Sequence, residues 1–276
     1  MDNIALLLLT GFVVGTLGTL IGAGGGFILV PILIITHPEF STETITAISM
    51  AIVASNAVSG TIAYARSGRI DYKAGLIFAL FTIPGSIFGV FTTSYIPAKT
   101  FHVIFGLLLI FVAFFLFLSK KTLSPVSPAA GQLKPGYIDS RITDRYGEVH
   151  QYRYRMLYGI LISLVVGYLS PLLGIGGGII HVPALIHWLN FPVYIATATS
   201  HFILAIMSVV SVITHAFNGS YRNPEVLRMV LALGFGAIAG AQLGALLSHR
   251  IKGNLIVRAL AVCLALVGIR ILLSHG

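Results

Sequence analysis

The sequence contains few charged residues and a single cysteine. Charged side chains make up 9% of the 276 residues, whereas soluble domains carry about 25%. No Asp, Glu, Lys or Arg occurs between Arg155 and Arg222, and about 20 apolar residues suffice to cross a bilayer. We therefore expect this stretch to cross a membrane more than once. Cys263 has no second cysteine to pair with, which excludes an intrachain disulfide and a thiolate metal cluster.

The sequence also lacks the motifs of common enzymes and of ATP-driven pumps. It holds no serine nucleophile elbow, no His-Glu-x-x-His zinc motif and no Gly-Lys-Ser/Thr phosphate loop. We therefore expect that the protein is not an enzyme and that it has no cofactor and no metal site. The net charge of +9 comes from cations in loops between apolar segments, which is typical of membrane orientation rather than of nucleic-acid binding.

Apolar segments indicate an all-α, polytopic membrane protein with about eight spans. The expected spans are residues 4–35, 44–65, 74–95, 100–119, 157–187, 196–216, 227–248 and 255–273. Cations gather after the second span, in the central linker and in the loop around Arg222, so we place these loops in the cytoplasm. Both termini are then expected to be cytoplasmic. Arg250 and Lys252 argue against this placement, because they would face outward.

The chain divides into two homologous halves. We assign residues 1–119 to the first repeat, 120–156 to a flexible cytoplasmic linker broken by Pro and Gly, and 157–276 to the second repeat. Residues 15–36 and 167–188 are identical at 12 of 22 positions. Four spans per half would give both halves one orientation. If each glycine-rich segment crossed the membrane twice, each half would have five spans and the two halves would be inverted. The charge pattern favours four spans per half.

Each half contains three consecutive glycines followed five residues later by proline, which predicts a broken first helix. Bare N–H groups and the positive end of the helix that follows attract anions, and irregular backbone inside a membrane belongs beside a cavity. The candidate substrate-binding glycines are Gly24, Gly25, Gly26, Gly176, Gly177 and Gly178. By contrast, the four-residue spacings Gly85/Gly89 and Gly236/Gly240 favour close helix packing.

Polar side chains recur at the start of the next span in each half. The candidate ligands are Thr46, Ser49, Asn56, Thr197, Thr199, Ser200 and His201. Hydroxyl groups in membrane helices commonly bond back to their own backbone, and this alternative stays open. No Asp or Glu lies in a predicted span, so histidine is the titratable group at depth. His181 and His201 are the proton-coupling candidates, and a simple hydrogen-bonded histidine is the alternative.

The two segments Gly22-Ala-Gly-Gly-Gly-Phe-Ile-Leu-Val-Pro31 and Gly174-Ile-Gly-Gly-Gly-Ile-Ile-His-Val-Pro183, each followed by Thr-Ala-x-Ser, resemble the TauE/SafE family of sulfite and organosulfonate exporters. The resemblance implies a cytoplasmic-membrane carrier that exports a small sulfur-containing anion without ATP hydrolysis. This chain departs from the family at His201 and in its longer linker. We expect a small anion and the bilayer as partners and no nucleic acid, with a homodimer left open. An anion channel and a membrane scaffold are the alternatives.

Overall fold

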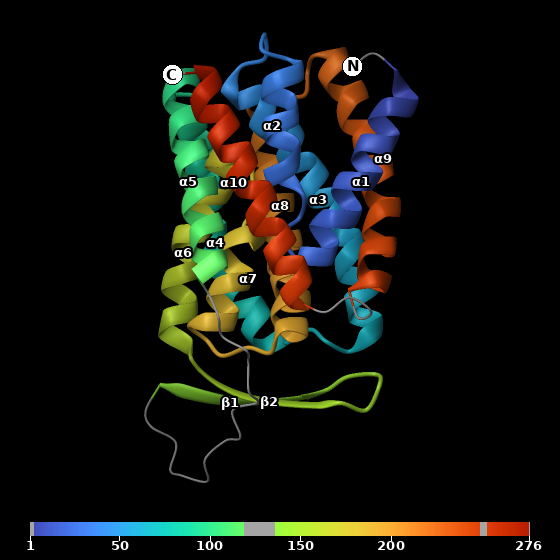
Figure 1. Cartoon of the computed structure of the whole chain (residues 1–276), viewed down its shortest axis with the longest axis vertical. Helices are drawn as coiled ribbons and strands as arrows, with labels where there is room; N and C mark the ends of the chain where they lie inside the picture. Colours follow the sequence, from blue (N-terminus) through green and yellow to red (C-terminus); the bar gives the residue numbers. More distant parts are fainter. Residues whose placement is uncertain (1–2, 119–135, 249–252, 276) are drawn as a thin grey trace.

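The computed structural model describes residues 3–118, 136–248 and 253–275, and the side chain of Cys263 lies outside the described part. The first half contains α1 (Ile4–Ile21), α2 (Gly26–Thr36), α3 (Thr42–Ser67), α4 (Tyr72–Thr93) and α5 (Ala98–Leu118). The second contains α6 (Met156–Leu173), α7 (Gly178–His187), α8 (Val193–Phe217), α9 (Pro224–Leu247) and α10 (Gly253–His275). Strands β1 (Tyr137–Thr143) and β2 (Val149–Arg155) lie across one end of the bundle (Figure 1).

The bundle has the surface and the helix lengths of a multi-pass membrane protein. Seven helices of the described chain are long and apolar enough to cross a bilayer: α1, α3, α4, α5, α6, α8 and α9. Large apolar side chains such as Phe88, Phe111 and Leu231 are exposed on the outside of the bundle. Exposed apolar surface on this scale suits lipid rather than water. Helices α2 and α7 are apolar but short, with 11 and 10 residues.

Both glycine breaks are present, and each one turns the chain back. Gly22 ends α1 with φ 82°, and Gly24 and Gly25 also have positive φ before α2 begins at Gly26. Only glycine adopts this conformation without strain. In Figure 1, α1 enters from the end that holds the N-terminus and α2 returns to that end, whereas α6 and α7 form the matching helical hairpin from the opposite end.

The two halves are inverted relative to each other. Helices α5 and α10 are the fifth helices of their halves and pack antiparallel, since Gly106 lies against Leu272 while Gly268 lies against Ile110. Equivalent helices that run in opposite directions require a two-fold axis in the membrane plane. The expected eight spans with both halves in one orientation are therefore wrong, because each glycine triplet reverses the chain instead of kinking one span. Strands β1 and β2 consequently lie at the end opposite to the start of α1 and the end of α10 (Figure 1).

Closely packed glycines join the halves along two helix pairs. Helix α1 packs against α9 and α6 packs against α4. A methyl group on Gly240 would lie 2.1 Å from the carbonyl oxygen of Phe12, and one on Gly89 would lie 2.4 Å from that of Tyr168. The packing role predicted from the four-residue glycine spacing is confirmed.

The second part of the linker is a β-hairpin, which corrects both the all-α prediction and the expected lack of regular structure. The strands pair antiparallel, with Tyr137 opposite Arg155 and Thr143 opposite Val149. The alternating β-branched and aromatic residues favour strands, and Gly147 supplies a positive φ of 83° in the turn. The charge and proline content of the linker obscured this pattern.

The hairpin docks onto loops from both halves. The hydroxyl groups of Ser140 and Tyr152 donate to the carboxylate of Asp71, which also caps α4. The rings of Tyr152 and Tyr154 pack against Phe191, in the loop between α7 and α8. The hairpin therefore bridges the α3–α4 loop of the first half and the α7–α8 loop of the second.

Candidate functional site

The two glycine breaks contact each other inside the bundle. A methyl group on Gly26 would lie 2.3 Å from the carbonyl oxygen of Gly174, and one on Gly178 would lie 2.0 Å from that of Gly22. Hydrogen is therefore the only side chain that fits at Gly26 and Gly178. The breaks meet backbone to backbone, so the structure represents a state that is closed at this point.

Unused backbone donors and two helix N-termini occupy the same place. The N–H groups of Gly25, Gly26, Gly177 and Gly178 donate no hydrogen bond to another residue of the described chain. Helices α2 and α7 both begin here, and the N-terminus of a helix carries a partial positive charge of about half an elementary charge. A small anion would find donors and positive potential here once the breaks separate.

Two serines tie each half to the break of the other half. The Ser49 hydroxyl donates to the Gly174 carbonyl at 2.5 Å, and the Ser200 hydroxyl donates to the Gly22 carbonyl at 3.3 Å. These serines occupy equivalent positions on α3 and α8. In this state they therefore hold the breaks closed across the two-fold axis.

The predicted threonines have other partners. Thr46 donates to the carbonyls of Thr42 and Glu43, and Thr197 donates to the carbonyl of Val193, so both bond back to their own helix. The Thr199 hydroxyl accepts the N–H of Asp71 just before α4. In this state the three hydroxyls are engaged by the protein.

Four buried side chains form what we call the polar column: Thr19, Asn56, Tyr64 and His201. The Thr19 hydroxyl donates to Asn56 Oδ1 at 2.5 Å and lies 3.3 Å from His201 Nε2. The Tyr64 hydroxyl donates to the Thr19 carbonyl at 2.8 Å. Sequence reasoning missed Thr19 and Tyr64, although Thr19 lies one turn before the first glycine of the break.

The polar column leaves two polar atoms unused. Because the single proton of the Thr19 hydroxyl goes to Asn56, Nε2 of His201 donates to Thr19, which leaves Nδ1 as an acceptor. This Nδ1 and the Asn56 amide nitrogen have no partner within the described chain. A buried unsatisfied group costs about 1–3 kcal/mol. Both atoms are therefore suited to a ligand or water that occupies the column transiently.

His181, the other proton-coupling candidate, lies apart from the polar column. It lies on α7, where its Nε2 is 3.2 Å from the Ser163 hydroxyl of α6. Ser163 also donates to the carbonyl of Gly159 within its own helix. His181 is therefore part of the contact between α6 and α7.

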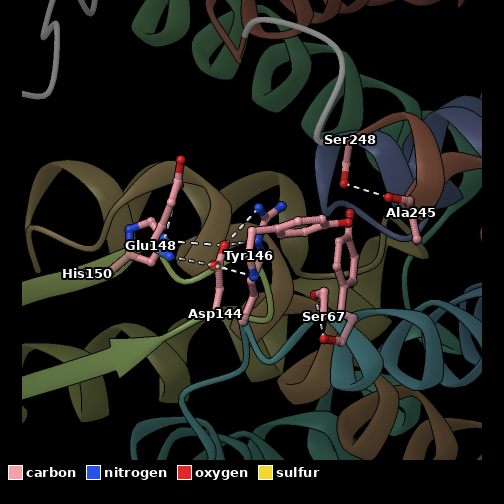
Figure 2. A network of polar contacts seen from close by, with 9 residues as sticks. Ser67, Asp144, Tyr146, Glu148, His150, Ala245 and Ser248 are labelled. Atoms are coloured by element: carbon pink, nitrogen blue, oxygen red, sulfur yellow. Dashed lines mark hydrogen bonds and ion pairs between the residues drawn. The ribbon is translucent and has the colours of Figure 1, made fainter.

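A cavity of about 270 Å³ opens at the hairpin end of the polar column. We call it the cationic cavity, because Arg66, Arg69 and Arg145 line it and no Asp or Glu is among its lining residues. Tyr64 belongs both to its wall and to the polar column. Figure 2 shows Tyr146, Ser67 and Ser248 around this space. The cavity thus connects to the buried centre through Tyr64.

An ion pair fixes one wall of the cationic cavity. Nε and Nη2 of Arg69 donate to Asp144 Oδ2 at 3.0 and 2.9 Å, and the guanidinium carbon lies 5.1 and 4.9 Å from the ring centroids of Tyr146 and Tyr194. Burial by itself would raise the pKa of Asp144, but hydrogen bonds from Arg69 and from the N–H groups of Tyr146 and Glu148 hold it below its ordinary value. The hairpin turn is thereby anchored to the end of α3 (Figure 2).

A second cavity, at the opposite end of the bundle, is lined by carboxylates. This cavity of about 510 Å³ is lined by Glu39 and Glu43 together with the loop between α8 and α9. The Ser220 hydroxyl donates to Glu43 at 2.9 Å and lies 3.4 Å from His215 Nδ1. The linings of the two cavities therefore differ in charge. The loop around Arg222 lies at this second end, so the expectation that it shares a side with the linker is wrong.

Comparisons with known proteins identify relatives along almost the whole chain. The chain is 32% identical to the probable membrane transporter protein YunE of Bacillus subtilis, over 98% of this chain and 97% of the relative. It is 27% identical to a probable membrane transporter protein of Methanocaldococcus jannaschii, over 97% and 95%. No solved structure matches.

The model of the sulfite exporter TauE/SafE family matches residues 7–271. The family and the relatives are named as membrane transporters and not as enzymes. The resemblance predicted from the duplicated glycine segments is confirmed: the chain belongs to the TauE/SafE family.

Proposed function

We propose that this membrane transporter exports a small sulfur-containing anion, sulfite or an organosulfonate, from the cytoplasm by alternating access. The observation that carries the proposal is the pair of facing helix N-termini at Gly26 and Gly178, which the polar column links to the cationic cavity. Backbone N–H groups and positive helix ends bind an oxyanion without a buried arginine.

Charge supports an orientation that differs from the expected one. The hairpin end carries more cations than the other end: Arg66, Arg69, Lys73, Arg153 and Arg155 against Lys99, Arg222 and Arg228. Because cytoplasmic loops carry an excess of Lys and Arg, we propose that the hairpin end faces the cytoplasm. Both termini then lie outside. The end of α9 and the start of α10 also lie at this hairpin end, whereas Arg250 and Lys252 between them lie outside the described residues. In this orientation the loop around Arg222 lies on the outer side, which corrects the cytoplasmic placement expected for it from the sequence.

The inverted halves suggest how access alternates. An inverted repeat can adopt two conformations of similar energy by exchanging the roles of its halves. In the closed state Ser49 and Ser200 hold the breaks together, so opening toward one side requires one of these bonds to break. The released N–H groups of Gly25, Gly26, Gly177 and Gly178 then bind the anion, with Asn56 as a further donor.

We further propose His201 as the group that couples transport to protons. It is the histidine of the polar column and lies next to the glycine break, and its Nδ1 has no hydrogen-bond partner within the described chain. Protonation would attract the anion while the column is open. His181 is the weaker candidate, because Ser163 occupies its Nε2 and it lies outside the column.

Flux measurements in proteoliposomes test the proposal. Sulfite, sulfoacetate, thiosulfate and sulfate are each offered at several pH values to the wild type and to His201→Ala. We expect saturable flux of at least one of the four, counterflow, and loss of pH dependence in the variant. If none of the four is transported, the sulfur-anion assignment fails. Flux that neither saturates nor shows counterflow would establish a channel instead.

A further inference from the structure

The cationic cavity contains more positive charge than its own contacts neutralise. Asp144 compensates Arg69, but no carboxylate of the described chain lies within 4.0 Å of the guanidinium groups of Arg66 or Arg145. Two cations that face one cavity repel each other, and a bound anion relieves this repulsion. The cavity therefore has the charge of an anion-binding site.

We propose that the cationic cavity is an entry site that binds the oxyanion head group of the transported substrate before it reaches the glycine breaks. This inference rests on the proposed function. Arg66 and Arg145 are the binding residues, and Arg69 is a positioning residue that Asp144 holds in place. The ligand is a free sulfite or sulfonate group of the kind that arginine binds through paired N–H donors.

The neutral polar groups of the cavity are already engaged. Tyr64 donates to the Thr19 carbonyl, Ser248 donates to the Ala245 carbonyl, and the Gln242 amide donates to Ser59. The two unpaired arginines are thus the strongest free donors that the described lining offers. Tyr64 connects the bound anion to the polar column, so the next step for the anion leads toward His201 and Asn56.

The β-hairpin completes the site. Arg145 and Tyr146 come from its turn, whereas Arg66 and Arg69 come from the end of α3 and the residues after it. The turn is held by the Arg145 N–H, which donates to the Ser67 carbonyl at 3.0 Å, and by the Arg69–Asp144 pair. A linker without this hairpin would leave the cavity without Arg145.

Binding of radiolabelled sulfite to the full-length protein in nanodiscs of neutral lipid tests the site. Because each variant loses a charge-assisted hydrogen bond to the anion, the double variant Arg66→Gln/Arg145→Gln should bind sulfite about tenfold or more weakly. The matched control is Arg141→Gln, an exposed arginine of β1 that does not line the cavity. It should bind sulfite within about twofold of the wild type. Equal loss in both variants would overturn the site, because net charge alone would then explain the effect.

Two further measurements separate the outcomes. In proteoliposomes of known orientation, the double variant should raise the KM for sulfite on the hairpin side and leave the maximal rate unchanged. Normal flux with unchanged KM and unchanged binding overturns the entry site while the proposed function stands. Absence of all sulfur-anion flux in the wild type overturns the proposed function instead. If phosphatidylglycerol nanodiscs abolish sulfite binding and the arginine variants lose only lipid retention, a lipid headgroup occupies the cavity and the free-anion proposal is wrong.

Discussion

The two halves have the same backbone arrangement but differ in the polar side chains beside the glycine breaks. Ser49 and Ser200 occupy matched positions and make matched bonds to the opposite break. The polar column, by contrast, has no counterpart in the repeat. The residues that match Thr19, Asn56, Tyr64 and His201 are Pro171, Met207, His215 and Met50. The difference suggests that symmetry provides the two conformations, whereas the one-sided column provides the proton coupling proposed for His201.

The largest expected effect comes from breaking the shared backbone contact. Gly178→Ala places a methyl group 2.0 Å from the Gly22 carbonyl oxygen, and overpacking of this kind costs about 3 kcal/mol or more. We expect a large fall in melting temperature and in the yield of monodisperse protein. Gly26→Ala should behave alike, because its methyl group meets the Gly174 carbonyl at 2.3 Å.

The control for these variants is Gly234→Ala on α9, where the nearest atom is Ser55 Oγ at 3.3 Å. Only a small change in melting temperature is expected there. Unaltered stability of Gly178→Ala would show that the breaks are not in contact. A large effect at one break and none at the other would show that the halves are not equivalent at the backbone.

The second effect concerns the polar column. His201→Met copies the residue that the first half has at the matching position, Met50, and keeps a side chain of similar size. We expect sulfite flux to fall about tenfold, the equivalent of one lost hydrogen bond to a buried group, while the melting temperature changes little. Flux and melting temperature are measured on the same preparation.

The control is Met50→Leu, a volume-conserving change in the first half, which should alter neither quantity. If His201→Met transports sulfite like the wild type, the asymmetry between the halves has no role in transport.

The third effect tests the matched serines. Ser49→Ala and Ser200→Ala each leave a buried glycine carbonyl without its donor, at a cost of about 1–3 kcal/mol. The larger loss of unfolding free energy is expected for Ser49, whose bond is shorter. Thr46→Ala is the control, because that hydroxyl bonds its own helix. Equal losses of unfolding free energy in all three variants would mean that the serine bonds between the halves stabilise the protein no more than a bond within one helix does.

Local features of the fold were predictable from the sequence, whereas chain direction was not. The glycine triplets predicted where α1 and α6 end, because three glycines remove helix propensity at once. They did not predict the reversal, which depends on the positive φ of Gly22, Gly24 and Gly25 and on the backbone contact with the other half. The inversion of the halves follows from this reversal.

Contacts between the halves explain why the site was predicted incompletely. His201 and Thr19 are 182 residues apart in sequence, and their contact depends on the inverted arrangement of the halves. Thr46 and Thr197 were predicted as ligands because they occupy matching positions in the two halves. Each hydroxyl instead donates to a carbonyl in the preceding turn of its own helix. The β-hairpin was missed because proline and charge outweighed the alternating pattern of Tyr137–Thr143.

The smallest expected effect is a difference in pH response between the docking of the hairpin and the polar column. The pKa of Asp144 lies below its ordinary value, and burial followed by the nearby Asp71 raises the pKa of Tyr152. Because the Asp144 pKa is lowered on folding, its contribution to docking is complete above about pH 4 and is lost as the pH falls further. Tyr152 stays neutral over the same range and keeps its bond to Asp71. In a His150→Gln variant, which removes the imidazole 3.8 Å from Asp144, the protection factors of residues 137–155 should therefore not change between pH 8 and pH 6, once corrected for the intrinsic pH dependence of amide exchange.

Protection of residues 137–155 should fall only in acid, near pH 4 and below. A pH dependence of sulfite flux between pH 8 and pH 6 would then originate inside the bundle, where His201 is the proposed group, and not in hairpin docking. Deprotection of the hairpin within that range, in step with the change in flux, would contradict this assignment. The pH dependence of transport would then originate in the linker as well as in the side chains that distinguish the two halves.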